Sequence, residues 1–305
     1  MPSSESFCYN GHQLPAMFLI GAQKCGTTSF SKQLMDQYGF QGGQGFDDGL
    51  GFSTTKEHHF FNIAKRYEKG LGSFASGFPA CETASHVVAT IDATPNYFMY
   101  DEDAARLASM YGRWRLERTT FAILLCDPVS RAQSAWYHFH STQSNGHSSS
   151  EAGSFKSWSH AHANDASQGI WAAGMYGQHL DAWLAAVGHV VIIPSTTYFA
   201  EADVTLTHLV AEYRRRSGRP APHGRGHSAE AFSANHHSHP SLSSDHFPSD
   251  RAKIKALFAA SNEHVYDLVK TDRRVKTIPY GRSAGVSRAH YRMSTAPQGL
   301  SLIHI

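Results

Sequence analysis

The sequence has little net charge. Its 305 residues include 27 Lys and Arg against 25 Asp and Glu, which leaves a formal net charge of +2. A protein that binds DNA or RNA through the phosphates needs a strongly basic face. We therefore expect no nucleic-acid partner, and any anionic ligand must be held by a local group of charges and hydrogen-bond donors.

Cysteine is also scarce. Only Cys8, Cys25, Cys81 and Cys126 occur, and no C-x-x-C pair is present. This usage predicts neither a disulfide framework nor a cysteine-rich zinc site. Histidine is abundant, with 21 residues, but the His-rich stretch 223–246 lacks an ordered set of carboxylate or Cys partners, so we expect no metal cofactor.

Long apolar runs are missing as well. The apolar stretch 14–22 is about half of the roughly 20 residues that a membrane-spanning helix needs, and no Lys or Arg precedes it. We therefore expect no signal peptide, no membrane contact and a cytoplasmic location. A chain trimmed of its targeting segment would have the same features.

Short apolar runs alternate with helical patterns along the chain. Buried strands are expected at residues 17–21, 87–92, 120–126 and 190–193. Amphipathic or helix-compatible stretches are expected at residues 28–38, 103–111, 128–140, 175–187, 202–216 and 251–270. This alternation predicts an α/β fold with a central parallel sheet flanked by helices.

Three regions are expected from this pattern. Residues 1–14 form an N-terminal extension, residues 15–275 form one domain, and residues 276–305 form a C-terminal tail of uncertain order. Within the domain, the Ser-rich stretch 141–154 and the Pro/His/Ser/Gly-rich stretch 218–248 are expected to be loops.

A candidate phosphate-binding loop lies at residues 21–29, which read Gly-Ala-Gln-Lys-Cys-Gly-Thr-Thr-Ser. The loop follows a strand and opens a helix, where unpaired N–H groups and the helix dipole favour an anion. In the nucleotide-triphosphatase P-loop the Lys follows the last Gly directly, whereas Lys24 precedes Gly26 by two positions. The spacing resembles the 5′-phosphosulfate loop of sulfotransferases that use 3′-phosphoadenosine 5′-phosphosulfate (PAPS). The resemblance implies a P-loop-like topology and the donor-binding residues Gln23, Lys24, Cys25, Gly26, Thr27, Thr28 and Ser29.

A second segment, residues 126–134, reads Cys-Asp-Pro-Val-Ser-Arg-Ala-Gln-Ser. It resembles the R-D-P-x-x-R-x-x-S segment with which this family binds the 3′-phosphate. The resemblance implies a donor-binding role for Ser134 and places Arg131 at the inner Arg, where it serves structure more than ligand. Cys126 stands where the first Arg is usual, so one charge-assisted contact is missing.

The segment at residues 56–61 reads Lys-Glu-His-His-Phe-Phe. It resembles the K-E-x-x-F-F segment of the heparan-sulfate-type sulfotransferases, which implies that Glu57 is the catalytic base. A carboxylate within hydrogen-bond reach can take the proton of an acceptor, and Lys24 can neutralise charge on the departing nucleotide. His58 and His59 are alternative bases, because imidazole titrates near neutrality.

Another histidine, His138, follows Ser134 by four residues, one helical turn. This spacing resembles the sulfotransferase half of the heparan N-deacetylase/N-sulfotransferases, which implies a catalytic role for His138. An ordinary histidine on a helix surface is the alternative.

Residues 91–98 read Ile-Asp-Ala-Thr-Pro-Asn-Tyr-Phe. They resemble the E-K-x-P-x-Y-F segment that lines the acceptor cleft of the family, which implies acceptor contacts from Thr94 and Tyr97, beside His58 and His59. Ala93 replaces the usual Lys and argues against a polyanionic acceptor. The family's K-G-R-x-x-P loop corresponds to Asn-His-His-Ser-His-Pro at residues 235–240.

Taken together, the resemblance covers about residues 17–270 and is nearest to the glycosaminoglycan N- and 3-O-sulfotransferase domain. It implies in-line transfer of a sulfuryl group from PAPS to a hydroxyl or amine of a saccharide or small-molecule metabolite, with release of 3′-phosphoadenosine 5′-phosphate (PAP). The alternatives are a nucleotide-dependent kinase and a non-catalytic nucleotide-binding protein. For such an enzyme the Golgi lumen is the alternative to the cytoplasm.

Overall fold

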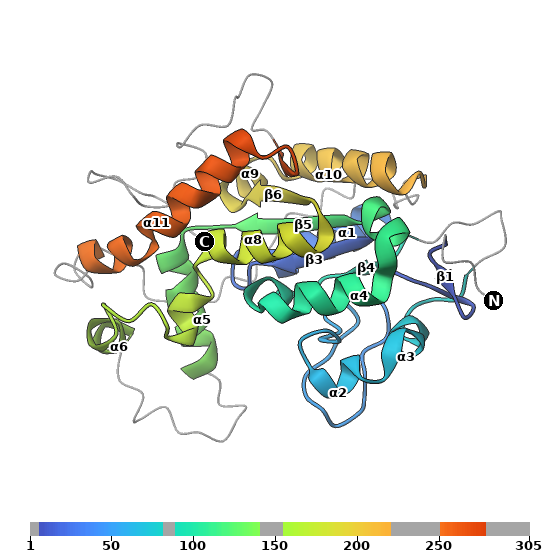
Figure 1. Cartoon of the computed structure of the whole chain (residues 1–305), viewed down its shortest axis with the longest axis horizontal. Coiled ribbons are helices and arrows are strands. Elements are labelled where there is room, and N and C mark those ends of the chain that lie inside the picture. The colour runs from blue at the N-terminus through green and yellow to red at the C-terminus, as the bar shows by residue number, and fades with distance from the viewer. Residues whose placement is uncertain (1–5, 82–88, 141–154, 221–250, 279–305) are drawn as a thin grey trace.

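A computed structural model describes residues 6–81, 89–140, 155–220 and 251–278 (Figure 1). The central sheet has the order β4-β3-β5-β6-β7, and each neighbouring pair is parallel. Its strands are β3 (Met17–Gly21), β4 (Ile91–Asp92), β5 (Thr120–Leu125), β6 (Val190–Pro194) and β7 (Val275–Thr277). The predicted α/β fold with a central parallel sheet flanked by helices is confirmed.

Helices cover both faces of this sheet, which explains why β3, β5 and β6 are buried along their whole length. On one face, Phe18 stacks on Phe121, and Phe121 also contacts Trp183 of α8 (Tyr176–Val187). Helix α4 (Asp101–Arg118) lies beside α8 in Figure 1, with α10 on the other side of the sheet. The helices of that other side are α1 (Thr27–Tyr38), α9 (Ser195–Ala200) and α10 (Ala202–Ser217).

A second apolar cluster lies beside the sheet and is built on Trp136, Phe155, Trp171 and Phe258. It joins four helices, α5 (Pro128–His140), α6 (Phe155–Ala161), α7 (Gly169–Ala172) and α11 (Arg251–Thr271). The described part also contains the short helices α2 (Ala64–Tyr67) and α3 (Gly70–Ser76) and the 3₁₀ turn η1 (Tyr97–Met99).

Most predicted elements are found within a few residues of their expected bounds. Helix α4 is longer than the predicted 103–111, because the helix resumes after a kink at Gly112, whose φ is 70°. Strand β7 was not predicted. The expected loop 141–154, the His-rich stretch 223–246 with residues 235–240, and the tail beyond residue 278 lie outside the described residues.

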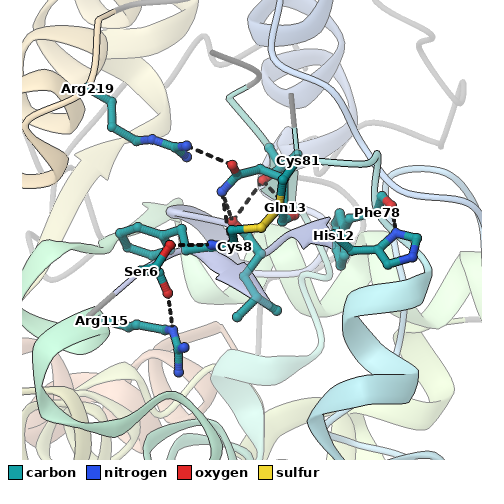
Figure 2. Close-up of a disulfide and its surroundings, with 11 residues drawn as sticks. Ser6, Cys8, His12, Gln13, Phe78, Cys81, Arg115 and Arg219 are labelled. Atoms are coloured by element: carbon teal, nitrogen blue, oxygen red, sulfur yellow. Dashed lines mark hydrogen bonds between the residues drawn. A yellow bond between two sulfur atoms is a disulfide. The ribbon is translucent and has the colours of Figure 1, made fainter. Parts of the chain in front are cut away.

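The prediction of a chain without disulfides is wrong, because Cys8 is bonded to Cys81 and Cys25 to Cys126. The partners are 73 and 101 residues apart in the sequence, so no local cysteine pattern reveals them. Figure 2 shows the first bridge, which ties a hairpin of β1 (Cys8–Tyr9) and β2 (His12–Gln13) to residue 81.

Side chains hold this hairpin on both sides of the bridge (Figure 2). Arg219 donates a hydrogen bond to the side-chain oxygen of Gln13 over 2.7 Å, and Arg115 donates to the carbonyl of Ser6 over 2.7 Å. The neighbouring Phe7 and Leu14 belong to the main core. In the ranges that the structure describes, no helix combines the length and the apolar character needed to cross a membrane.

The order of the strands marks one position at the edge of the sheet. The chain passes from β3 to β4 on one side and then returns to β5 on the other side of β3. Ligands of open α/β sheets bind at such a reversal, outside the carboxyl ends of the two strands. The segments that follow β3 and β5 therefore flank the expected ligand site.

Candidate active site

The loop after β3 presents backbone N–H groups at the start of α1. Gly26 precedes the helix with φ 95°, and a Cβ there would lie 2.7 Å from the ring of Phe199, so only glycine fits. The first turn of α1 has no acidic residue, and no described side chain caps it. Its N–H groups are therefore oriented to receive an anion.

Lys24 of this loop lies close to the Lys-Glu pair of residues 56 and 57. Burial lowers the pKa of the Lys24 ammonium, while the charge of Glu57 raises it and that of Lys56 lowers it. The fold thus places the phosphate-type loop and the candidate base in one electrostatic cluster, although 33 positions separate Lys24 from Glu57 in the sequence.

The Glu57 carboxylate is held by two neighbours. The Lys56 ammonium donates a hydrogen bond to Glu57 Oε1 and another to Thr28 Oγ1 over 3.0 Å. The His59 Nε2 atom lies 3.5 Å from Glu57 Oε2. Burial by itself would raise the pKa of Glu57, but His59 and Lys56 outweigh it and the pKa is lowered. The carboxylate is therefore ionised at neutral pH and able to accept a proton.

A buried network holds the backbone around Glu57. Asp92, at the end of β4, accepts hydrogen bonds from the hydroxyls of Thr94 over 2.6 Å and Tyr97 over 2.9 Å. The Thr94 oxygen accepts the N–H groups of residues 58 and 59, and the Tyr97 oxygen accepts the N–H of residue 60. The base segment is thereby fixed to the strand next to β3.

Three of the predicted acceptor-binding residues lie inside the protein, within or beside this network. Thr94, Tyr97 and His58 are fully buried. The two hydroxyls are engaged by Asp92 and by backbone N–H groups, and the His58 ring packs against Phe78 with centroids 4.5 Å apart. These side chains lie behind the base segment, and only His59, beside Glu57, keeps a place at the site.

The second candidate donor segment, residues 126–134, opens α5. Asp127 Oδ1 accepts the N–H of Ser130 over 2.8 Å and so caps this helix. Arg131 is buried and donates to the carbonyl of Ile170, which gives it a structural position. Ser134 is half-buried on the same helix. His138 lies exposed on α5 beside the ring of Phe139, and its catalytic role stays a prediction.

Sequence reasoning missed several residues of this region. The side chain of Asn96 accepts a hydrogen bond from Gln23 over 3.3 Å, and Ser195 donates to the carbonyl of Cys25 over 2.7 Å. Lys56 was read only as part of a motif, and Asp92 as part of a motif and as the magnesium ligand of the kinase alternative. One feature of the sequence could have indicated the Cys25–Cys126 bridge. Both cysteines belong to segments expected to bind the same nucleotide, so the two segments were expected to lie close together.

The chain has the α/β fold of the sulfotransferases. Among solved structures it is similar to the crystal structure of a sulfotransferase from Alicyclobacillus acidocaldarius, with a TM-score of 0.52 and 20% sequence identity. The alignment covers 85% of this chain and 96% of that chain. Neither the protein-family models nor the curated proteins give a match. At this level of identity the likeness establishes the fold.

Proposed function

We propose that the protein is a sulfotransferase that moves a sulfuryl group from PAPS to a hydroxyl or amine of an acceptor. One observation carries the proposal: the Lys56 ammonium donates to both Glu57 Oε1 and Thr28 Oγ1, which places the candidate base at the first turn of α1, beside Lys24 and the reversal point of the strand order. A cation next to an uncapped helix start suits the donor's phosphosulfate, and an ionised carboxylate nearby suits removal of the acceptor's proton.

The donor would be held by the two segments that follow β3 and β5. The N–H groups at the start of α1, the Lys24 ammonium and the hydroxyls of residues 27–29 would bind the 5′-phosphosulfate. Ser134 of α5 would contact the 3′-phosphate. The side chain of residue 126 cannot supply a charge there, because Cys126 is bonded to Cys25.

The transfer itself needs one proton acceptor and one stabilising cation. As the acceptor oxygen or nitrogen attacks sulfur, its proton passes to Glu57, whose lowered pKa keeps the carboxylate ionised at neutral pH. The bond between sulfur and the 5′-phosphate oxygen breaks, and PAP leaves with the negative charge. Lys24 stabilises that charge by a preorganised electrostatic contact.

The acceptor side favours a saccharide or a small-molecule metabolite over a polyanion. The family's cleft lysine is replaced by Ala93, which is buried and donates its N–H to the carbonyl of Lys56. The two disulfides favour an oxidising compartment, such as the Golgi lumen, over the cytoplasm.

The kinase alternative relies on an aspartate at the end of β4 to hold magnesium. That residue is Asp92, which is buried and already accepts hydrogen bonds from Thr94 and Tyr97. This arrangement favours sulfuryl transfer over phosphoryl transfer.

Nucleotide binding followed by transfer tests the proposal. PAP at about 100 times its Kd stabilises the folded state by roughly 2.7 kcal/mol, which raises the melting temperature by about 5–10 °C for a domain of this size. ATP with magnesium is the parallel sample. Labelled PAPS and a fractionated extract then identify which compound acquires the label. A shift with ATP and magnesium alone, or PAP release with no labelled product, would contradict the proposal.

A further inference from the structure

The Cys25–Cys126 disulfide crosses the reversal point of the sheet. Cys25 lies in the loop between β3 and α1, and Cys126 directly follows β5. These are the two segments that the proposed function assigns to the donor. The bridge therefore joins the candidate 5′-phosphosulfate loop to the candidate 3′-phosphate segment by a covalent bond.

Cys25 is anchored by several contacts besides its disulfide. Its N–H donates to the carbonyl of Ala22 over 3.1 Å, and its own carbonyl accepts from the Ser195 hydroxyl over 2.7 Å. Its sulfur lies 3.6 Å from the hydroxyl of Tyr176, and the residue is buried. The disulfide adds a covalent anchor to the second candidate donor segment.

The residues on either side of Cys25 have left-handed backbone conformations. Lys24 has φ 73° and Gly26 has φ 95°. For a residue with a Cβ, such as Lys24, this conformation costs roughly 1–2 kcal/mol, so the surrounding structure must impose it. Fixing Cys25 fixes both the direction of the Lys24 side chain and the first N–H groups of α1.

We propose that Cys25 and Cys126 are positioning residues of the donor site, and that tight donor binding requires their disulfide. The inference rests on the proposed function and adds a redox requirement to it. The bridge holds the loop in its anion-binding conformation before the donor arrives, which lowers the ordering cost of binding. The bridge ends at Cys126, the position where the family's first Arg, and with it a charged contact to the donor, is missing.

The reverse step is ordinary thiol–disulfide exchange. Two equivalents of a small thiol such as glutathione reduce the bridge to two cysteine thiols and are oxidised to one small-molecule disulfide. The reduced loop keeps its hydrogen bonds, including the one from the Ala22 N–H to the Leu124 carbonyl of β5, but loses its covalent bond to Cys126. Its left-handed conformation at Lys24 is then imposed by fewer contacts, and donor affinity falls.

The second disulfide supplies a matched control within the same chain. Cys8–Cys81 ties the β1–β2 hairpin to residue 81 (Figure 2) and includes no residue of either donor segment. A variant with Cys8→Ser and Cys81→Ser leaves the Cys25–Cys126 bridge as the only one, so reduction of that variant isolates its effect.

The experiment measures the Kd of PAP by calorimetry, before and after treatment with a phosphine reductant, at a temperature where circular dichroism shows the fold intact. Thiol alkylation and mass spectrometry on a separate sample confirm the redox state. Reduction is expected to weaken PAP binding at least tenfold in the wild-type protein and in the Cys8→Ser/Cys81→Ser variant. The Cys25→Ser/Cys126→Ser variant is expected to bind PAP weakly, with a Kd that the reductant does not change.

Steady-state kinetics separate positioning from general stability. Reduction is expected to raise the KM for PAPS while leaving the KM for the acceptor within about twofold. Equal PAP affinity of the oxidised and reduced Cys8→Ser/Cys81→Ser variant would overturn the inference, even if the other variant fails to fold. Absence of PAP binding in the fully oxidised wild-type protein would instead overturn the proposed function.

Discussion

The hydroxyl of Thr94 donates to Asp92 Oδ1 over 2.6 Å, and the Thr94 Oγ1 atom accepts the backbone N–H of His58 over 2.8 Å. Through this relationship the end of β4 determines where the base segment lies. Because β4 pairs with β3, and β3 leads into the candidate donor loop, two neighbouring strands set the position of Glu57 relative to Lys24.

Replacing Thr94 tests this coupling. Thr94→Val keeps the shape but removes the hydroxyl, which leaves the N–H groups of residues 58 and 59 without their acceptor. A displacement of the base by about 1 Å can cost roughly 100-fold in rate, so we expect a kcat loss of that order with PAP affinity unchanged. Thr94→Ser is the matched control and should stay within a few-fold of wild type. Equal rates for the two variants would show that Thr94 does not position the base.

Glu57→Gln tests the proton acceptor directly. The amide keeps the size of the side chain but takes no proton, so transfer should fall by roughly 10²- to 10⁴-fold while PAP affinity is retained. Lys24→Ala should lose both transfer and PAP affinity, because the proposal assigns its ammonium to the donor's phosphosulfate. Calorimetry with PAP and labelled transfer assays measure the two quantities. A Glu57→Gln enzyme with full activity would remove Glu57 from the role of base.

The sequence predicted the local parts of this arrangement and missed the distant ones. The strand 17–21 and the helix 128–140 have the predicted bounds, because apolar runs and a proline in the first turn are local signals. Thr94 and Tyr97 were expected to face the acceptor. Nothing in the sequence indicates that Asp92 engages their hydroxyls inside the protein, because this follows from how the segments pack in space.

The pairing of the cysteines illustrates the same limit. A cysteine pair becomes visible in a sequence through close spacing or a dense framework, and Cys25 and Cys126 have neither. Their contact is created by the parallel pairing of β3 with β5, which brings the carboxyl ends of both strands to one edge of the sheet.

Lys56→Met tests what keeps Glu57 ionised. The pKa of Glu57 lies below its usual value of 4.5, since His59 and Lys56 outweigh the effect of burial. Transfer by the wild type, which needs the ionised form, should therefore be constant through neutral pH and should fall only below about that value. Without the Lys56 charge the pKa rises, so the acid limb of the kcat profile should move to higher pH. An acid limb at the same pH in both proteins would contradict the assignment. Lys65→Met, on an exposed lysine of α2, is the control.

The buried His189, between the end of α8 and the start of β6, gives a prediction for stability. Burial, followed by the charge of Arg216, lowers the pKa of His189 to about 4 from the ordinary 6.5. Its Nε2–H donates to the carbonyl of Thr119 over 2.8 Å. At pH values between about 4 and 6.5, His189 is therefore protonated in the unfolded chain and neutral in the folded protein. The stabilising contribution is fully present above pH 6.5 and is lost as the pH falls towards 4.

His189→Gln should reduce this pH dependence, because the Gln amide can donate at the place of Nε2 and does not titrate. Between pH 7 and pH 4.5 the free energy of unfolding of the wild type should fall by about 2–3 kcal/mol more than that of the variant. Urea unfolding followed by circular dichroism at both pH values measures the difference. The same substitution at the exposed His208 should leave the dependence unchanged. Parallel losses in wild type and His189→Gln would mean that the folded protein accepts the proton at His189 without penalty.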